Sequence, residues 1–483
     1  MPKKTDFYSR LNIHTGASED AIKRAYRMAV KQAHPDVNKQ TGATELFLGI
    51  QEAYQVLSHP QKREDYDQGR EPRSSESDVH LTVQYSSENL FHYQEPQVIY
   101  SLIDVVSPEE DKDLSNLPLN IALVLDTSTS MKGKRLEILK AATKEIIHDL
   151  DPDDAVSVVS FNDRARVLLA NQTNPQPLKV ESSINTLFAE GGTEIFQGLE
   201  AAFEEINKKP TDSYISHIVL ITDGHTYGDE DNCFTLAKTA ATMDIGLSSL
   251  GIGVEWNDEF VDELCALTGG ESKFIENPSQ VKDFLKESIF SLKEASARQI
   301  SLFMQPAPGV ERLSSFRILP EVLPLPAEEE IPLGVMKKDQ HHRVLFEFFI
   351  QPVPQKIDRV VIANGEFILK RKPRDFSLPF TLERPLIEPV DTPSSPPEEI
   401  FQAISHLAFY RLQEKAQRDI VQGNPGAAYQ RLLNLSSHLM AKGQNDLAKI
   451  AMKEAEYIKS HHTFSPDGKK QLKYGTRRLL LPG

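Results

Sequence analysis

The feature that most constrains the fold is an alternation of short apolar runs and helical patterns between residues 119 and 292. The runs "NIALVLD", "AVSVVSF", "HIVLIT" and "IGLSSLGI" have the length and composition of buried strands, and amphipathic stretches such as 134–149 and 178–207 lie between them. Strands that alternate with helices form a parallel sheet covered on both faces. We therefore predict a doubly wound α/β domain over residues 119–292.

Polar residues follow these apolar runs where strands are expected to end. "IALVLDTSTSM" places Asp126, Ser128 and Ser130 after the first run, "LITDG" places Asp223 after another, and "AEGGTEIF" offers Thr193. Ligands of open α/β sheets bind at the carboxyl ends of the strands. Two carboxylates and three hydroxyls are hard oxygen donors, which suit Mg²⁺ or Mn²⁺ rather than zinc. Taken alone, Asp-x-Ser-x-Ser is also common turn chemistry.

The combination of "DTSTS", "GGTEI" and "LITDG" with this order of elements resembles a von Willebrand factor A domain with its metal-ion-dependent adhesion site. The resemblance implies that Ser128 and Ser130 ligate one Mg²⁺ or Mn²⁺ directly. It implies that Thr193 binds directly or through water, and that Asp126 and Asp223 bind mainly through water. An acidic residue of a partner protein would complete the coordination shell.

A metal held by hydroxyls could in principle activate water for hydrolysis. No histidine or third acidic residue stands at a convincing spacing to act as the base, and His225 in "DGHTY" is more typical of a solvated loop. We therefore expect binding rather than catalysis, and no enzyme activity.

A separate helical module is predicted over residues 4–68. Ser18 is a suitable helix cap, and the helix after it carries Ile22 and Tyr26 on one face and basic residues on the other. A later helical pattern carries apolar residues at 47, 50, 54 and 57. Two antiparallel helices would bury these faces together and leave the turn His34-Pro35-Asp36 exposed at the tip.

The segments "FYSRLNI", "AIKRAYRMAVKQAHPDVN" and "FLGIQEAYQVLSHPQKREDYD" together resemble the J-domain of DnaJ-type cochaperones. The resemblance implies that His34, Pro35 and Asp36 contact a DnaK-type heat-shock chaperone and trigger its ATP hydrolysis. Salt should weaken this docking because it depends on charge. The cationic docking face would comprise Lys23, Arg24, Arg27 and Lys31. The Gly/Phe-rich segment and cysteine-rich zinc repeats of full-length DnaJ are missing, which argues against general substrate holding.

The remaining segments suggest a multidomain chain. Strand-like runs in 81–118 and 293–388 flank the α/β unit, so the simplest architecture inserts that unit into a β-sandwich. Polar or Pro/Ser-rich linkers are predicted at 69–80 and 389–397. Residues 398–483 form a C-terminal helical region, in which we expect Asn424-Pro425 to start a helix and the basic tail 465–481 to be a solvated end.

Charge and composition restrict the partners. The net charge is −16, and because residues 1–70 hold 11 Lys and Arg against 9 Asp and Glu, the remainder carries −18. An acidic body argues against nucleic acid as the main partner. No apolar run reaches the roughly 18 residues of a membrane span, and the first residues do not form a secretory signal. With only two cysteines, we expect a cytoplasmic protein.

Two functions of different kinds fit these features. In the first, the adhesion-type domain captures a protein client through metal, and the J-domain directs a DnaK-type chaperone to that client. In the second, the chain is a scaffold partner of a MoxR-type AAA+ ATPase, and the J-domain is ancillary. Similar sandwich and helical segments accompany adhesion-type domains in bacterial multidomain proteins, which favours a bacterial source.

Overall fold

The computed structural model describes most of the chain and divides it into two compact units, Met1–Ser77 and Asp78–Gly483. Each unit is considered by itself. The described residues are 7–11, 22–23, 25–26, 29, 50, 53–54, 57–58, 79–107, 117–224, 228–253, 257–275, 278–353, 357–371, 375–389 and 395–480.

The described residues of the first unit are helical apart from Leu11 and Ser58, which are in turns, and its first helix is α1 (Phe7–Arg10). The rings of Tyr26 and Tyr54 stack with their centroids 3.9 Å apart, and Lys23 is exposed. The predicted burial of the two apolar faces against each other is therefore confirmed for these residues. The buried cluster consists of Tyr8, Leu11, Ile22, Ala25, Ile50, Ala53 and Leu57. The predicted docking residues Arg24, Arg27, Lys31, His34, Pro35 and Asp36 lie outside the described residues.

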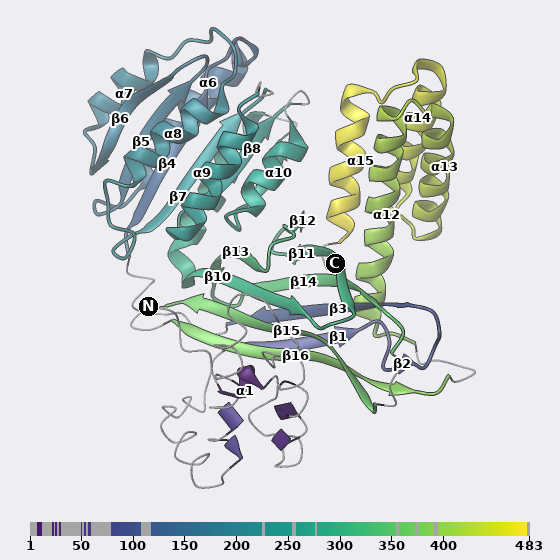
Figure 1. The fold of residues 1–483 in the computed structure, drawn as a ribbon. Coiled ribbons are helices and arrows are strands. Elements are labelled where there is room, and N and C mark those ends of the chain that lie inside the picture. The colour runs from purple at the N-terminus through teal and green to yellow at the C-terminus, as the bar shows by residue number, and fades with distance from the viewer. Residues whose placement is uncertain are drawn as a thin grey trace. The chain divides into compact units, whose positions relative to one another are not determined.

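The second unit contains the predicted α/β domain, whose sheet has the strand order β6-β5-β4-β7-β8-β9 (Figure 1). All neighbouring strands are parallel except β5 and β6, which are antiparallel. The strands are β4 (Leu119–Asp126), β5 (Ala155–Phe161), β6 (Ala165–Thr173), β7 (Ile215–Thr222), β8 (Gly246–Ile252) and β9 (Ser272–Ile275).

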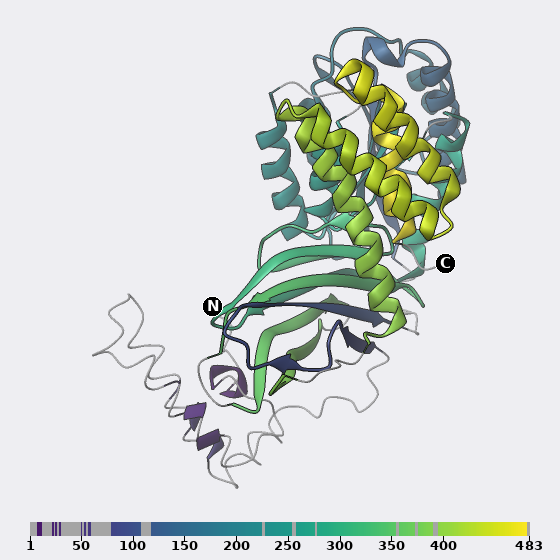
Figure 2. The same ribbon diagram turned by 90° about the vertical axis from the view of Figure 1, so that its right-hand side faces the viewer.

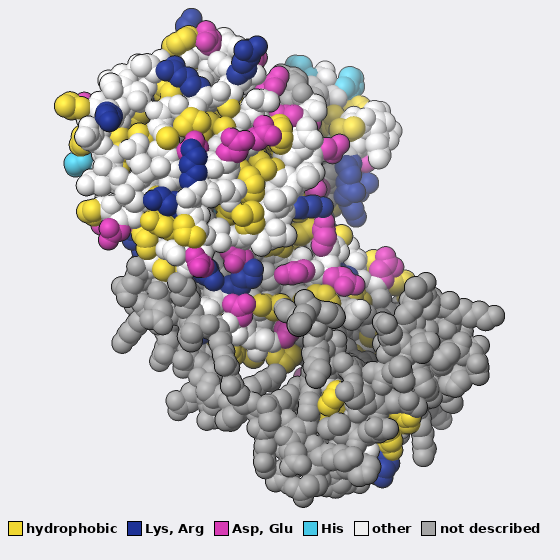
Figure 3. Space-filling model, turned by 60° about the vertical axis from the view of Figure 1, so that its left-hand side comes forward, with side chains coloured by type: hydrophobic (Ala, Val, Ile, Leu, Met, Phe, Trp, Pro, Cys, Tyr) yellow, Lys and Arg dark blue, Asp and Glu magenta, His cyan; other side chains and the backbone are white. Residues whose placement is uncertain are grey.

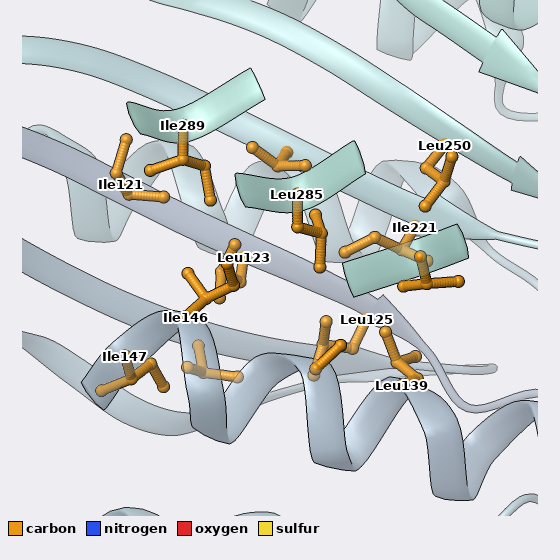
Figure 4. Close-up of a cluster of buried hydrophobic side chains, with 14 of the residues drawn as sticks. Ile121, Leu123, Leu125, Leu139, Ile146, Ile147, Ile221, Leu250, Leu285 and Ile289 are labelled. Atoms are coloured by element: carbon orange, nitrogen blue, oxygen red, sulfur yellow. The ribbon is translucent and has the colours of Figure 1, made fainter. Parts of the chain in front are cut away.

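Helices cover both faces of this sheet, because its central strands are apolar on both sides. Alternate residues of β4 point to opposite faces: Ile121, Leu123 and Leu125 join one buried cluster, whereas Ala122 and Val124 join the other. Figure 4 shows the first cluster, where Leu139 and Ile146 of α6 meet the strand. The helices are α6 (Lys134–Asp149), α7 (Pro177–Asn185), α8 (Ile195–Ile206), α9 (Glu230–Thr242), α10 (Asp258–Ala266) and α11 (Val281–Phe290).

Strands from both sides of the α/β domain form a β-sandwich, so the predicted insertion is confirmed. One sheet has the order β1-β3-β14-β11-β12 and the other β13-β10-β15-β16-β2. The early strands are β1 (His80–Tyr85), β2 (Leu90–Phe91) and β3 (Gln97–Val106). The later strands are β10 (Ala295–Pro306), β11 (Val310–Leu319), β12 (Leu323–Pro324), β13 (Glu330–Lys337), β14 (His341–Ile350), β15 (Arg359–Lys370) and β16 (Phe376–Ile387).

The C-terminal region is a bundle of four helices that lie side by side in both ribbon views (Figures 1 and 2). They are α12 (Glu398–Val421), α13 (Pro425–Ala441), α14 (Asn445–His461) and α15 (Pro466–Leu479). The first half of α12 packs on the sandwich, where Ile400, Leu407 and Tyr410 join a buried cluster with Phe316 and Leu345. Asn424-Pro425 starts α13 as predicted.

The expectation of a solvated basic tail is wrong. Residues 466–479 form helix α15, in which Lys473, Thr476 and Arg477 are buried. The positive charges of Lys473 and Arg477 are paired with Asp258 and Asp262 of α10. The tail is basic because it docks against acidic residues of the α/β domain.

Two buried histidines predict a loss of stability in acid. Burial lowers the pKa of His217 on β7 to about 4 and that of His342 on β14 to about 3. The unfolded chain protonates both near pH 6.5, so from there down to the folded pKa the unfolded state binds more protons and the free energy of unfolding falls. Between about pH 7 and about pH 5, each histidine should lower that free energy by about 2 kcal/mol.

Urea unfolding followed by circular dichroism at both pH values measures this change. A His217→Asn, His342→Gln double variant should lose much of the pH dependence, whereas His148→Gln, which alters an exposed histidine of α6, should retain it. An unchanged pH dependence in the double variant would contradict the assignment.

Candidate functional site

Two aspartates meet at the carboxyl edge of the α/β sheet. Asp126 is the last residue of β4, and Asp223 directly follows β7. β4 and β7 are parallel neighbours in which Leu125 pairs with Ile221, so both strands end at the same edge. Both aspartates are fully buried. The structure therefore brings together acidic residues that are far apart in the sequence.

Hydroxyl groups connect the two carboxylates. The backbone N–H of Ser128 donates to Asp126 Oδ1 at 2.7 Å. Ser128 Oγ lies 2.9 Å from Ser130 Oγ, and Ser130 Oγ donates to Asp223 Oδ1 at 2.5 Å. Asp126, Ser128, Ser130 and Asp223 thus form one hydrogen-bonded chain, so the structure brings these four predicted site residues together.

Thr193 reaches the same edge on the loop before α8. The backbone N–H of Thr129 donates to the Gly191 carbonyl at 3.2 Å, which fixes this loop against the Ser128–Ser130 turn. A Cβ built on Gly224 would lie 3.0 Å from Thr193 Oγ1, so the threonine hydroxyl lies beside the segment that follows Asp223. Gly191 has φ +74°, and a Cβ there would lie 2.4 Å from Asp163 Oδ2, so this position requires glycine.

Electrostatics at the site favour a cation. Burial raises the pKa of Asp126 to about 6, and the nearby charge of Asp223 adds to the rise, although hydrogen bonds from Ser128 and Thr222 oppose it. A positive charge between two buried carboxylates would relieve this cost. Asp223 already has one positive charge beside it, because Nη1 of the partly exposed Arg135 lies 2.5 Å from Asp223 Oδ2.

The donor set is the feature that decides which ion could bind. Among the described residues there is no cluster of three or more His, Cys, Asp and Glu side chains that could hold a metal. The edge instead presents two carboxylates and three hydroxyls, which suits Mg²⁺ or Mn²⁺ and not a site built for zinc. His225, considered as a base for hydrolysis, lies outside the described residues.

Two residues at this edge were not predicted from the sequence. Thr222 Oγ1 donates to Asp126 Oδ2 at 2.6 Å, and Arg135 pairs with Asp223. Thr222 could have been suspected, because it directly precedes Asp223 at the end of an apolar run. Arg135 gave no comparable signal, because a basic residue in the first turn of an amphipathic helix is usually solvated.

Family models match three parts of the chain. The DnaJ domain model matches residues 6–67, and the von Willebrand factor type A domain model matches residues 120–287. The chain joins a DnaJ domain to a von Willebrand factor type A domain. A third model, the Sll0103-like C-terminal alpha-helical domain, matches residues 398–482. Below, the first two are called the DnaJ domain and the VWA domain.

Two kinds of bacterial protein are similar in sequence. Uncharacterized protein sll0103 of Synechocystis sp. is 29% identical over 399 residues, which cover 79% of this chain and 92% of that protein. Chaperone protein DnaJ of Dictyoglomus thermophilum is 54% identical over 68 residues, which cover 14% of this chain and 17% of that protein. The likeness to DnaJ chaperones is therefore confined to the DnaJ domain.

Solved structures share the fold of the VWA domain and its surroundings. A von Willebrand factor type A protein from Catenulispora acidiphila aligns with a TM-score of 0.67 at 15% identity, over 84% of this chain and 98% of that chain. The ArnB paralog VWA2 from Sulfolobus acidocaldarius aligns with a TM-score of 0.53 at 14% identity, over 84% of this chain and all of that chain. At these identities the likeness is one of fold.

Two further observations concern the apolar and charged residues of the described part of the chain. Within the described residues, no helix combines the length and apolarity needed to cross a membrane. On the face shown in Figure 3, acidic and basic side chains of the described residues are interspersed among apolar ones.

Proposed function

We propose that this protein is a targeted J-domain cochaperone. Its DnaJ domain would bind a DnaK-type chaperone and stimulate ATP hydrolysis, while its VWA domain would hold a protein client through a divalent cation. The observation that carries the proposal is the presence in one chain of a DnaJ domain, 54% identical to that of a DnaJ chaperone, and a carboxylate–hydroxyl cluster at the edge of the VWA sheet.

The cation would be held by oxygen atoms alone. The hydroxyls of Ser128, Ser130 and Thr193 are the candidates for direct ligands, and the carboxylates of Asp126 and Asp223 are the candidates for contacts through water. Because neutral hydroxyls offset little of its charge, a Mg²⁺ or Mn²⁺ ion in this position would attract a further anionic ligand. An acidic side chain of a client supplies such a ligand.

The DnaJ domain would connect the captured client to a DnaK-type chaperone. The match to a DnaJ chaperone covers 17% of that protein, so the likeness does not extend to its other parts. The client must then be selected by the attached domains, and the VWA domain has the cluster suited to it. No step of this scheme requires the chain itself to be an enzyme, so we propose that it has no catalytic activity of its own.

Capture from cell lysate tests the metal-dependent half of the proposal. The immobilised full-length protein should retain specific proteins in Mg²⁺ and release them on chelation, as mass spectrometry would detect. Asp126→Asn removes a charge needed by the cation, so Mg²⁺ affinity measured by calorimetry should fall roughly 10- to 100-fold, and retention should fall with it. Asp153→Ala, which changes an exposed acidic residue just before β5, is the matched control.

Three results would change the conclusion. If calorimetry detects neither Mg²⁺ nor Mn²⁺ uptake by the wild-type protein, the metal-dependent half of the proposal fails. Equal retention by wild type and Asp126→Asn would also reject it. If the protein released by chelation is a MoxR-type AAA+ ATPase, and no chaperone client accompanies it, the scaffold function is supported instead.

A further inference from the structure

One basic residue stands beside the candidate cation site, and its position suggests a role in choosing the ligand. We infer that Arg135 is a specificity-determining residue, which binds the free oxygen of a carboxylate ligand and at the same time weakens cation binding. This inference rests on the proposed function of the site. It assigns to one side chain two opposite effects that can be measured separately.

The guanidinium of Arg135 is tied to the same carboxylate as the hydroxyl cluster. Its Nη1 donates to Asp223 Oδ2 at 2.5 Å and to the Ser130 carbonyl at 3.3 Å. The other oxygen of that carboxylate, Asp223 Oδ1, accepts from Ser130 Oγ at 2.5 Å. Asp223 therefore holds a candidate cation ligand on one oxygen and a permanent positive charge on the other.

The surrounding backbone leaves room for this guanidinium. Arg135 lies in the first turn of α6, whose Leu136 and Leu139 are buried in the core. Gly253 follows β8, and a Cβ built there would lie 2.8 Å from Arg135 Nη2. The bare backbone of Gly253 thus admits the second terminal nitrogen of the guanidinium, while Asp223 binds the first.

Arg135 is also accessible to a ligand. Its side chain is 35% exposed, whereas that of Asp223 is completely buried. The contacts to Asp223 and Ser130 are made by Nη1, and an arginine has five N–H donors. A carboxylate that gives one oxygen to the cation has a second oxygen for these donors, and a charge-assisted hydrogen bond to arginine is a strong one.

The sign of each effect follows from charge. A fixed positive charge on Asp223 offsets part of the negative charge that attracts a cation, so Arg135 lowers cation affinity. The same charge attracts an anion, so it raises carboxylate affinity. A side chain with only a structural role would, on removal, weaken both equilibria together. Opposite changes are therefore the signature of the inferred role.

Arg135→Met in the full-length protein tests the inference. Calorimetric titration with MnCl₂ should give a dissociation constant about three- to tenfold lower than that of wild type. Sodium acetate should displace Mn²⁺-bound water, as followed by water-proton relaxation against sodium chloride at equal ionic strength. Its dissociation constant should be about three- to tenfold higher in the variant.

Two further variants separate the causes. Arg135→Lys keeps the charge but loses the planar fork, so Mn²⁺ affinity should stay near wild type while acetate binding weakens. Arg164→Met removes a charge from an exposed residue between β5 and β6, and should change neither constant by more than about twofold. Circular dichroism melting confirms that each variant is folded.

The outcomes are distinct. If wild type takes up Mn²⁺ but Arg135→Met leaves both constants unchanged, or moves both in the same direction, the inference is wrong and the proposed function stands. If wild type takes up no Mn²⁺, the inference fails. If it takes up no Mg²⁺ either, the metal-dependent half of the proposed function fails as well.

Discussion

A His34→Gln substitution is expected to reduce the stimulation of a DnaK-type ATPase by this protein to the unstimulated rate. His34-Pro35-Asp36 lies within the segment matched by the DnaJ domain model, and the resemblance assigns chaperone contact to this tripeptide. The imidazole and the side chain of glutamine differ in shape and in their hydrogen-bonding atoms. Steady-state ATP turnover by purified DnaK, with and without the full-length protein, measures the effect.

The same variant should leave metal-dependent capture intact. Proteins retained in Mg²⁺ should be identical for wild type and His34→Gln, because the substitution lies in a different domain from the candidate cation site. His14→Gln, a histidine of the DnaJ domain outside the tripeptide, serves as the matched control and should stimulate DnaK normally. Full stimulation by His34→Gln would remove the basis for the cochaperone assignment.

An Asp262→Asn substitution is expected to cost about 3–5 kcal/mol in the free energy of unfolding. Asp262 Oδ1 accepts from Arg477 Nη1 at 3.0 Å, its Oδ2 accepts from Arg477 Nη2, and Lys473 Nζ lies 3.0 Å from Oδ2. Burial alone would raise the pKa of Asp262, but Arg477 and Lys473 outweigh it and hold this pKa at about 2. Without the carboxylate charge, Lys473 would keep its ion pair with Asp258, but the buried guanidinium of Arg477 would lose the carboxylate with which it pairs.

Urea unfolding followed by circular dichroism measures this loss. Glu259→Gln is the matched control on the same helix, because the Lys469–Glu259 pair is exposed and should contribute less than about 1 kcal/mol. If Asp262→Asn costs no more than Glu259→Gln, the buried charges do not hold α15 against the VWA domain. A large cost would establish that the C-terminal bundle is anchored there.

The parts of the fold that the sequence predicts are those set by local pattern. The alternation between 119 and 292 indicates a doubly wound sheet because each strand and helix carries its own apolar face. The local patterns of β11 and β13 indicate a strand only weakly. β11 carries the charged residues Glu311 and Arg312 near its start, and β13 contains Pro332 and Gly334, which are uncommon inside strands. Their places in the sandwich come from pairing with β14 and β10.

The candidate cation site likewise has some features that the sequence predicts and others that only the structure shows. The sequence by itself determined the chemistry of the donors, because Asp126 and Asp223 each end a strand pattern and parallel strands bring such ends to one edge. Only the tertiary structure decided that Arg135 pairs with Asp223 across 88 residues, and that Arg477 pairs with Asp262 across 215. The local sequence around Arg135 or Arg477 predicts only a solvated charge on a helix. The partner of each arginine is set by the packing of elements that are distant in the sequence, and such packing leaves no local pattern.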